Sequence, residues 1–204
     1  MTDESLMRKA IELALGLDAE SLASYVDAKR AANPSLDARA LARKFVTNYS
    51  SRAGLEGFLT GLPANPSIAI PGAIGDVGYI LRCYAGLVAT IGYLANPHYF
   101  DDPNWKTDAY VMVAGRTVVS RVLRDAGVAF GKQATKHLIR AHLSKGVLVA
   151  FKRAIFKWFA KKVTQRAIIA KSLPLVGGVI GGTWNLVEIR IIGNRAIAYH
   201  FDEA

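Results

Sequence analysis

Apolar residues recur at helical spacing along almost the whole chain, and no segment shows the clean alternation of apolar and polar residues that a half-buried strand requires. Proline punctuates this pattern at Asn33-Pro34, Asn96-Pro97 and Leu173-Pro174, because the residue before proline avoids helical backbone angles. The spacing predicts helices over about 3–17, 18–32, 35–61, 76–95, 106–125, 126–144, 145–171 and 175–201. We therefore expect an all-α fold, a single compact multi-helix bundle with apolar central and C-terminal helices.

The length of 204 residues suits one domain. We expect N-terminal helices over 1–35 and a helical domain over 36–204 to form that one domain together. Asp18 is expected to cap the helix that follows it, and Ser35 or Asn33 the next one. Residues 62–75 are rich in proline and glycine and are expected to form an apolar loop, after which Asp76 opens a new helix.

Charge is distributed unevenly along the sequence. The chain carries a net charge of +10, yet residues 1–125 hold 13 basic and 13 acidic residues. Residues 126–187 hold 11 basic residues and no acidic one. A segment of one sign attracts polyanions, and phosphate groups are the usual target. An ordinary solvated helix face, neutralised by other parts of the fold, is the alternative interpretation.

The helix predicted over 145–171 is both basic and aromatic. Arg153, Lys157 and Lys161 fall on one stripe at 100° per residue. Cations beside Phe and Trp are typical of a helix lying in a membrane interface. The candidate lipid-binding or polyanion-binding residues are Lys152, Arg153, Lys157, Lys161, Lys162 and Arg166, and the candidate inserting or packing residues are Phe151, Trp158 and Phe159.

The longest uncharged run is 172–187, which is 16 residues long. A membrane-spanning helix needs about 20 apolar residues, so a buried hairpin or a helix dipping into the interface fits this run better. Its glycines are paired at a spacing of four, which lets two helix backbones approach closely. The expected helix-contact glycines are Gly177, Gly178, Gly181 and Gly182.

Residues with catalytic potential form no recognisable constellation. His137 and His142 are five apart, which does not match the zinc-binding spacing of four on a helix. The lone Cys83 lies in an apolar helix and is expected to pack in the core. We therefore expect no metal site, no cofactor and, on balance, no enzyme. Three polar residues in apolar helices are expected in the core: Asp76, Arg82 and Asn185.

Three blocks of this sequence resemble the EcsC family of bacterial proteins. The first is Leu-Ala-Arg-Lys-Phe at 41–45 followed by Gly-Phe-Leu-Thr-Gly-Leu-Pro at 57–63. The second is Asp76 with Ile-Gly-Tyr at 91–93, and the third is the glycine-rich stretch 173–185 with Ile-Gly at 192–193 and 196–199. The resemblance implies an α-helical, membrane-associated bacterial protein and assigns no catalytic residue.

The leading hypothesis is therefore a cytoplasmic protein that lies peripherally on the inner face of an anionic membrane. The acidic start of the chain, without an apolar segment after it, favours the cytoplasm over secretion. An interaction module, forming a homo-oligomer or binding an integral membrane protein, is the second hypothesis. Nucleic acid is a third possible partner, although no nucleic-acid-binding motif is present.

Overall fold

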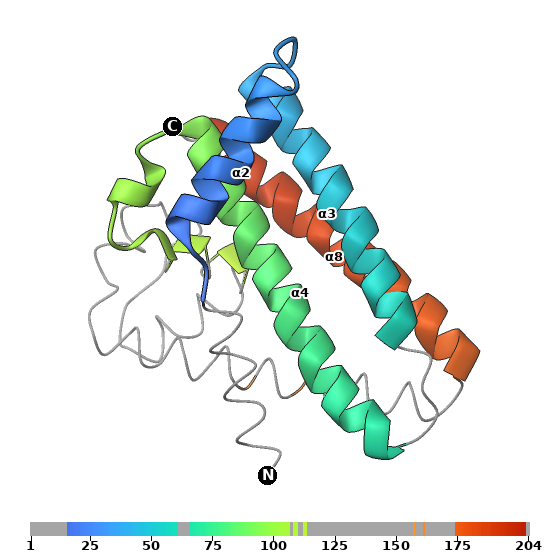
Figure 1. Ribbon diagram of the computed structural model, residues 1–204. Coiled ribbons are helices and arrows are strands. Elements are labelled where there is room, and N and C mark those ends of the chain that lie inside the picture. The colour runs from blue at the N-terminus through green and yellow to red at the C-terminus, as the bar shows by residue number, and fades with distance from the viewer. Residues whose placement is uncertain are drawn as a thin grey trace, which may run out of the picture.

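The regular structure of the chain is helical wherever it can be described. The computed structural model describes residues 16–60, 66–106, 108–109, 112–113, 157, 161 and 174–202. Within these residues the elements are α2 (Ala19–Ala31), α3 (Ala38–Thr60), α4 (Pro66–Ala95), the 3-10 turn η1 (Tyr99–Asp101) and α8 (Pro174–Phe201). Figure 1 shows the four α-helices packed as a bundle, so the all-α prediction is confirmed.

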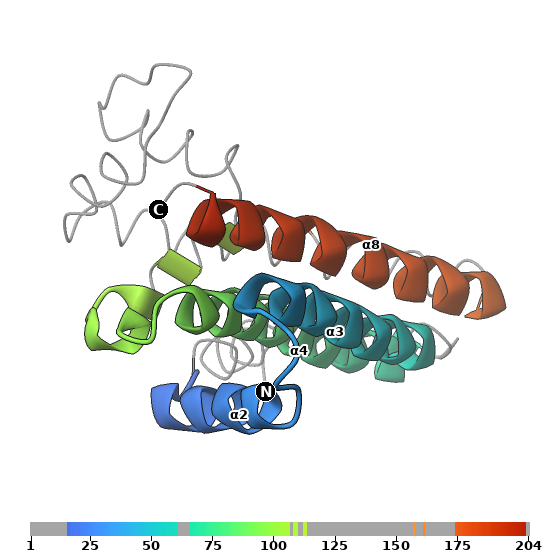
Figure 2. The ribbon, with the colours of Figure 1, turned by 90° about the horizontal axis from the view of Figure 1, so that it is seen from above.

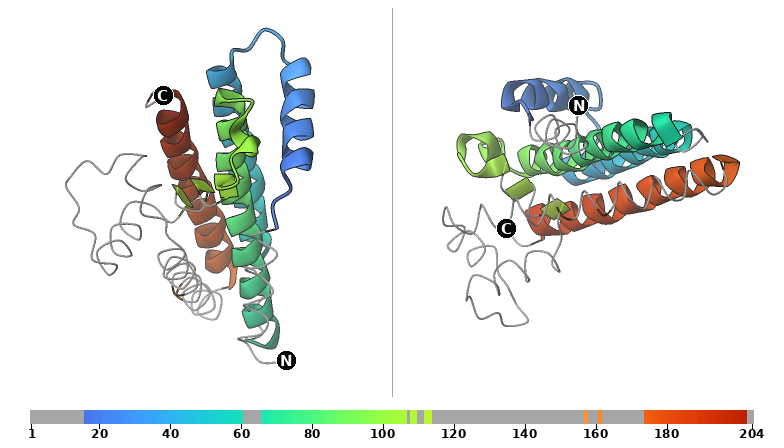
Figure 3. Two further views of the ribbon diagram at one scale, coloured as in Figure 1. Left: turned by 90° about the vertical axis from the view of Figure 1, so that its left-hand side faces the viewer. Right: turned by 90° about the horizontal axis from the view of Figure 1, so that it is seen from below.

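The bundle has three layers. Helices α3 and α4 lie side by side, α8 covers one face of this pair, and α2 packs against α4 on the other face (Figure 2). Figure 3 shows the same layering from the side. Leu17 and Val26, from the N-terminal part of the chain, belong to the same buried cluster as Leu41, Ile91 and Ile197. Helix α2 and the later described helices therefore share one core.

Helix α8 runs antiparallel to α3 and parallel to α4. A Cβ atom at Gly193 of α8 would meet Val46 of α3 and Leu87 of α4, while Gly54 near the end of α3 lies opposite Gly182 near the start of α8. At one end of the bundle, α3 consequently ends where α4 and α8 begin. We call this end, beyond the level of Val46, Leu87 and Gly193, the turn end (lower right in Figure 1).

Short side-chain hydrogen bonds fix where α2 and α3 begin. Asp18 caps α2 as predicted, since its carboxylate accepts a hydrogen bond from the Ser21 N–H at 2.8 Å. Helix α3 is capped by Asp37, which accepts from the Ala40 N–H at 2.6 Å, so the expectation of Ser35 or Asn33 is wrong. The Asn33 side chain bonds the Lys29 carbonyl and the Lys44 ammonium instead.

Helix α4 begins ten residues earlier than the sequence pattern predicts. It starts at Pro66, so 66–75 is helical rather than a loop and Asp76 does not cap a helix. Pro66 occupies the first helical position, where its missing N–H has no intrahelical acceptor in any case. Proline inside a helix gives up one hydrogen bond and crowds the carbonyl four residues earlier, so Pro71 is a costly position within α4. The end of α4 at Ala95, before Asn96-Pro97, matches the prediction.

The core is formed mainly by aliphatic side chains from α3, α4 and α8. Leu41 and Phe45 of the predicted α3 stripe are buried, and Tyr49 is partly buried. The largest fully buried side chains of the core are those of Tyr84, Phe45, Leu41, Ile80, Leu81, Leu87, Ile91, Ile189 and Val26. The middle of α4 is therefore the centre of the bundle.

We predict that Gly193→Ala lowers the free energy of unfolding by about 1–3 kcal/mol, because overpacking a close contact costs about that much. The new Cβ would lie 2.5 Å from Val46 Cγ2 and 3.1 Å from Leu87 Cδ2. Urea unfolding monitored by circular dichroism measures the effect.

Gly86→Ala is the matched control, because its new Cβ would have no neighbour closer than 3.8 Å. Removing a helical glycine there should stabilise the protein by up to about 1 kcal/mol. Equal effects of the two variants would contradict the proposed contact of Gly193.

Candidate functional site

Two cations of the basic helix predicted over 145–171 lie within the described residues. Lys157 and Lys161 are both helical and both exposed. Because they lie four residues apart, they share one helix face. The other candidates, Lys152, Arg153, Lys162, Arg166, Phe151, Trp158 and Phe159, lie outside the described residues.

The glycine pairs lie in the first half of α8. Gly182 is buried, and a Cβ atom at Gly54 of α3 would lie 3.5 Å from its carbonyl oxygen and 3.5 Å from Leu186 Cβ. The backbones of α3 and α8 thus approach closely at this point. Gly177, Gly178 and Gly181 are part of α8, but their surroundings lie outside the described part of the chain.

The three residues expected in a polar core have different environments. Asn185 is fully buried in α8. Arg82 is exposed, so its placement in the core is wrong. The buried face of α4 passes through Ile80, Leu81 and Tyr84, and Arg82 lies outside it, on the exposed side that also carries Tyr79. Asp76 lies within α4, and its side chain is outside the described residues.

A hydrogen bond that the sequence did not suggest links α4 to α8. The hydroxyl of Tyr84, which is fully buried, donates to Glu188 Oε2 at 2.7 Å. Burial raises the pKa of Tyr84 well above its usual value, and the neighbouring Glu188 carboxylate raises it further. The phenol therefore stays protonated and holds a carboxylate between the helices. No sequence signal pairs residues 104 positions apart.

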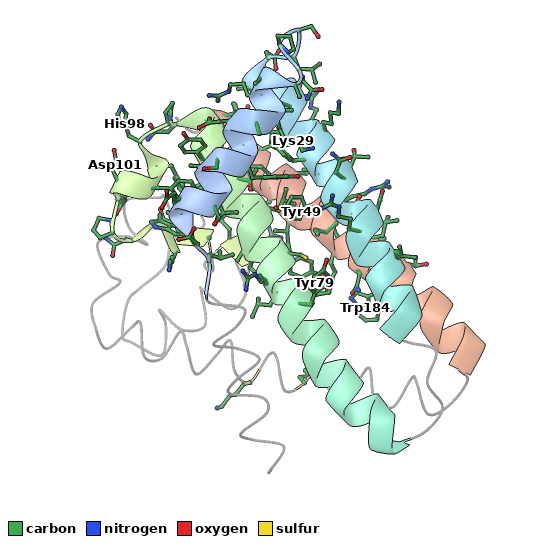
Figure 4. The ribbon with its side chains drawn as sticks, in the orientation of Figure 1. Lys29, Tyr49, Tyr79, His98, Asp101 and Trp184 are labelled. Atoms are coloured by element: carbon green, nitrogen blue, oxygen red, sulfur yellow. The ribbon has the colours of Figure 1, made fainter. Side chains whose placement is uncertain are left out.

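Tyr49 of α3 has a related environment. Its hydroxyl lies 3.8 Å from the position of a Cβ at Gly86 of α4, and Figure 4 shows the side chain between these helices. Burial raises the pKa of Tyr49 to about 12. Both phenols therefore remain neutral at physiological pH.

Aromatic rings gather at the end opposite the turn end. The Tyr99 ring packs edge-on against Phe100 and against the nearly buried His200, with centroids 5.5 and 5.3 Å apart. His98 Nδ1 lies 2.9 Å from Asp101 Oδ2 on the surface, and Asp102 accepts a hydrogen bond from the Asn104 N–H. These contacts order the connection after α4. Within the described ranges no group of three His, Cys, Asp or Glu residues is placed to hold a metal ion.

Among the residues that the structure describes, five large apolar side chains are exposed, by between 40% and 61%. Trp184, Val187 and Ile191 lie at helical spacing on one side of α8, while Leu55 belongs to α3 and Tyr79 to α4. Figure 4 shows Tyr79 and Trp184 on their separate helices. From the sequence, the run 172–187 is expected to form a buried hairpin or a helix dipping into the interface, and the particular side chains that stay exposed are not identified. The one sequence signal for this exposed surface is Trp184, which lies inside the uncharged run 172–187.

Among the helices that the structure describes, none combines the length and the hydropathy needed to cross a bilayer. Models of known protein families, curated proteins and solved structures were each compared with the chain, and none of them matches it.

We predict that the two buried tyrosines make the fold sensitive to alkali. Unfolded tyrosine ionises near pH 10, whereas the native pKa of Tyr49 is about 12. The contribution of Tyr49 to the free energy of unfolding is therefore fully present below pH 10. It is lost as the pH rises toward 12, which lowers the free energy of unfolding by about 2–3 kcal/mol.

Urea unfolding at a series of pH values between 8 and 12 measures this loss. Tyr49→Phe and Tyr84→Phe should each flatten the alkaline decline, because phenylalanine has no proton to lose. A decline as steep in both variants as in the wild type would show that other groups cause it.

Proposed function

We propose that the protein associates peripherally with anionic membranes through the basic aromatic helix at about 145–171. In this proposal it is an EcsC-like helical protein without catalytic activity. The observation that carries the proposal is the run 126–187, with 11 basic residues and no acidic one. Anionic headgroups are attracted to such a segment by about 1 kcal/mol per Lys or Arg near the surface.

The exposure of two cations supports this assignment. Lys157 and Lys161 are exposed on one helix face, where both ammonium groups can contact headgroups together. Lys152, Arg153, Lys162 and Arg166 would add to this charge, and Phe151, Trp158 and Phe159 would insert below it. Binding of this kind is reversible and weakens with salt, since the Debye length falls from about 10 Å at 0.1 M to about 3 Å at 1 M.

The resemblance to the EcsC family adds the cellular setting to the proposal. It implies an α-helical, membrane-associated bacterial protein, and our proposal sets that protein at the inner face of the membrane. An anionic cytoplasmic leaflet is the surface that juxtamembrane basic segments recognise.

An interaction module is the second candidate, and the exposed apolar side of α8 favours it. Trp184, Val187 and Ile191 form a stripe that a second copy or an integral membrane protein could bury. Sedimentation velocity should then show concentration-dependent association that Ile191→Asp abolishes. A strict monomer at all concentrations would contradict self-association.

We predict that replacing Arg153, Lys157 and Lys161 with Glu weakens binding to anionic vesicles by more than about 100-fold, since about 3 kcal/mol of attraction is lost. Co-sedimentation with vesicles of neutral or anionic lipid, at 0.1 M and 1 M salt, measures this. Helicity should not change.

The matched control reverses three exposed cations elsewhere: Lys29→Glu, Arg43→Glu and Lys106→Glu. This variant has the same net charge and should keep most of its binding. Equal loss in the two variants would show that total charge, and not the basic helix, governs binding. If RNA or DNA displaces the protein from the vesicles, a nucleic-acid partner is favoured instead.

A further inference from the structure

The five large apolar side chains that are exposed in the described part of the chain lie toward the turn end of the bundle. Leu55 follows Val46 on α3, Tyr79 precedes Leu87 on α4, and Trp184 precedes Gly193 on α8, as do Val187 and Ile191. The contact of Gly54 with Gly182 places the first and the last of these helices at one level. Three helices thus contribute apolar surface to the same half of the molecule.

The exposed charges that the structure describes in this half are basic. Arg52, Arg82 and Arg190 are all exposed, one on each helix. Among the described side chains of this half the acidic residue is Glu188, which accepts the hydrogen bond of Tyr84. The exposed acids of the described residues lie on α2 and its cap or at the opposite end: Asp18, Glu20, Asp27, Asp37, Asp101 and Asp202.

Beyond this level the sequence is nearly free of charge. Between Glu56 and Arg82 the one charged residue is Asp76, and 172–187 has none. At a rise of about 1.5 Å per residue, Pro66 lies about 20 Å beyond Tyr79, and Pro174 lies about 15 Å beyond Trp184. One leaflet of hydrocarbon is about 15 Å thick. Asp76 is three residues from Tyr79, so it remains near that level.

We propose that the turn end of the bundle inserts into one leaflet of an anionic bilayer. Trp184 and Tyr79 lie at the interface, where aromatic residues with a polar edge are favoured. Arg52, Arg82 and Arg190 reach the lipid phosphates with their long side chains. This inference rests on the proposed function and adds to it a second, apolar contact on different helices.

Charge favours lipid over a second copy of the chain as the occupant. In a two-fold dimer the same surface meets itself, so the arginines of both protomers would be gathered in one interface. Like charges brought together in an interface oppose binding, whereas anionic headgroups neutralise them.

The test uses full-length protein in which Trp105→Phe and Trp158→Phe leave Trp184 as the single tryptophan. Vesicles of phosphatidylcholine, with or without phosphatidylglycerol, carry brominated acyl chains that quench a tryptophan at leaflet depth. On anionic vesicles the Trp184 emission should move to shorter wavelength and be quenched. If the double variant fails to fold, the single variant Trp184→Phe supplies the same information. The bromolipids should then quench less tryptophan emission in this variant than in the wild type.

An affinity measurement accompanies the spectroscopy. Tyr79→Ser with Trp184→Ser should weaken binding to anionic vesicles by about 30-fold, because each half-exposed aromatic side chain at the interface gives up part of its transfer free energy. Ala198→Ser, at an exposed position farther along α8, is the matched control and should bind like the wild type.

Three results would overturn the inference. If anionic vesicles bind the protein and the Glu variant of the basic helix abolishes this, but Trp184 is not quenched, the proposed function holds and the insertion is wrong. If the wild-type protein binds no vesicle, both are wrong. If Trp184 emission shifts with protein concentration in the absence of lipid, a second copy is the occupant.

Discussion

The close approach of α8 to α3 and α4 is the contact on which the rest of the fold depends. At Gly193 the helix comes so near that a Cβ atom would lie 2.5 Å from Val46. Glycine costs a helix about 1 kcal/mol relative to alanine. Here that cost is offset because the apolar side chains of three helices close around one another, and Tyr84 can reach Glu188. The register set by this contact also decides which side chains remain on the surface.

Helical periodicity was sufficient to predict the fold class and most helix ends in the described part of the chain. The cap at Asp18 and the stop before Asn96-Pro97 follow from local chemistry, so one sequence reveals them. The start of α4 was missed because proline and glycine usually mark loops. There a long apolar helix tolerates Pro71 and Gly72, and the loss of one hydrogen bond does not outweigh the continuity of the helix.

The candidate site was predictable in its charge and not in its apolar part. The basic run is visible in the sequence because charge is counted directly. Exposure is not visible in this way, because an apolar helix has the same periodicity whether its outer side meets protein, lipid or water. Arg82 illustrates the difficulty, since only the packing of Ile80, Leu81 and Tyr84 shows which side of α4 faces outward. The Tyr84–Glu188 pair needed the tertiary structure in the same way.

The pairing of α3 with α8 also governs the order in which the chain can fold. Gly54 and Gly182 are neighbours in space and far apart in sequence, and Arg39 bonds Asp202 across 163 positions. Contacts of such high sequence separation form slowly, because a long loop must close before they are made. During synthesis, α3 and α4 emerge well before their covering helix. The faces that α8 covers lack this partner until α8 leaves the ribosome, and exposed apolar surface of this kind favours chaperone binding or aggregation.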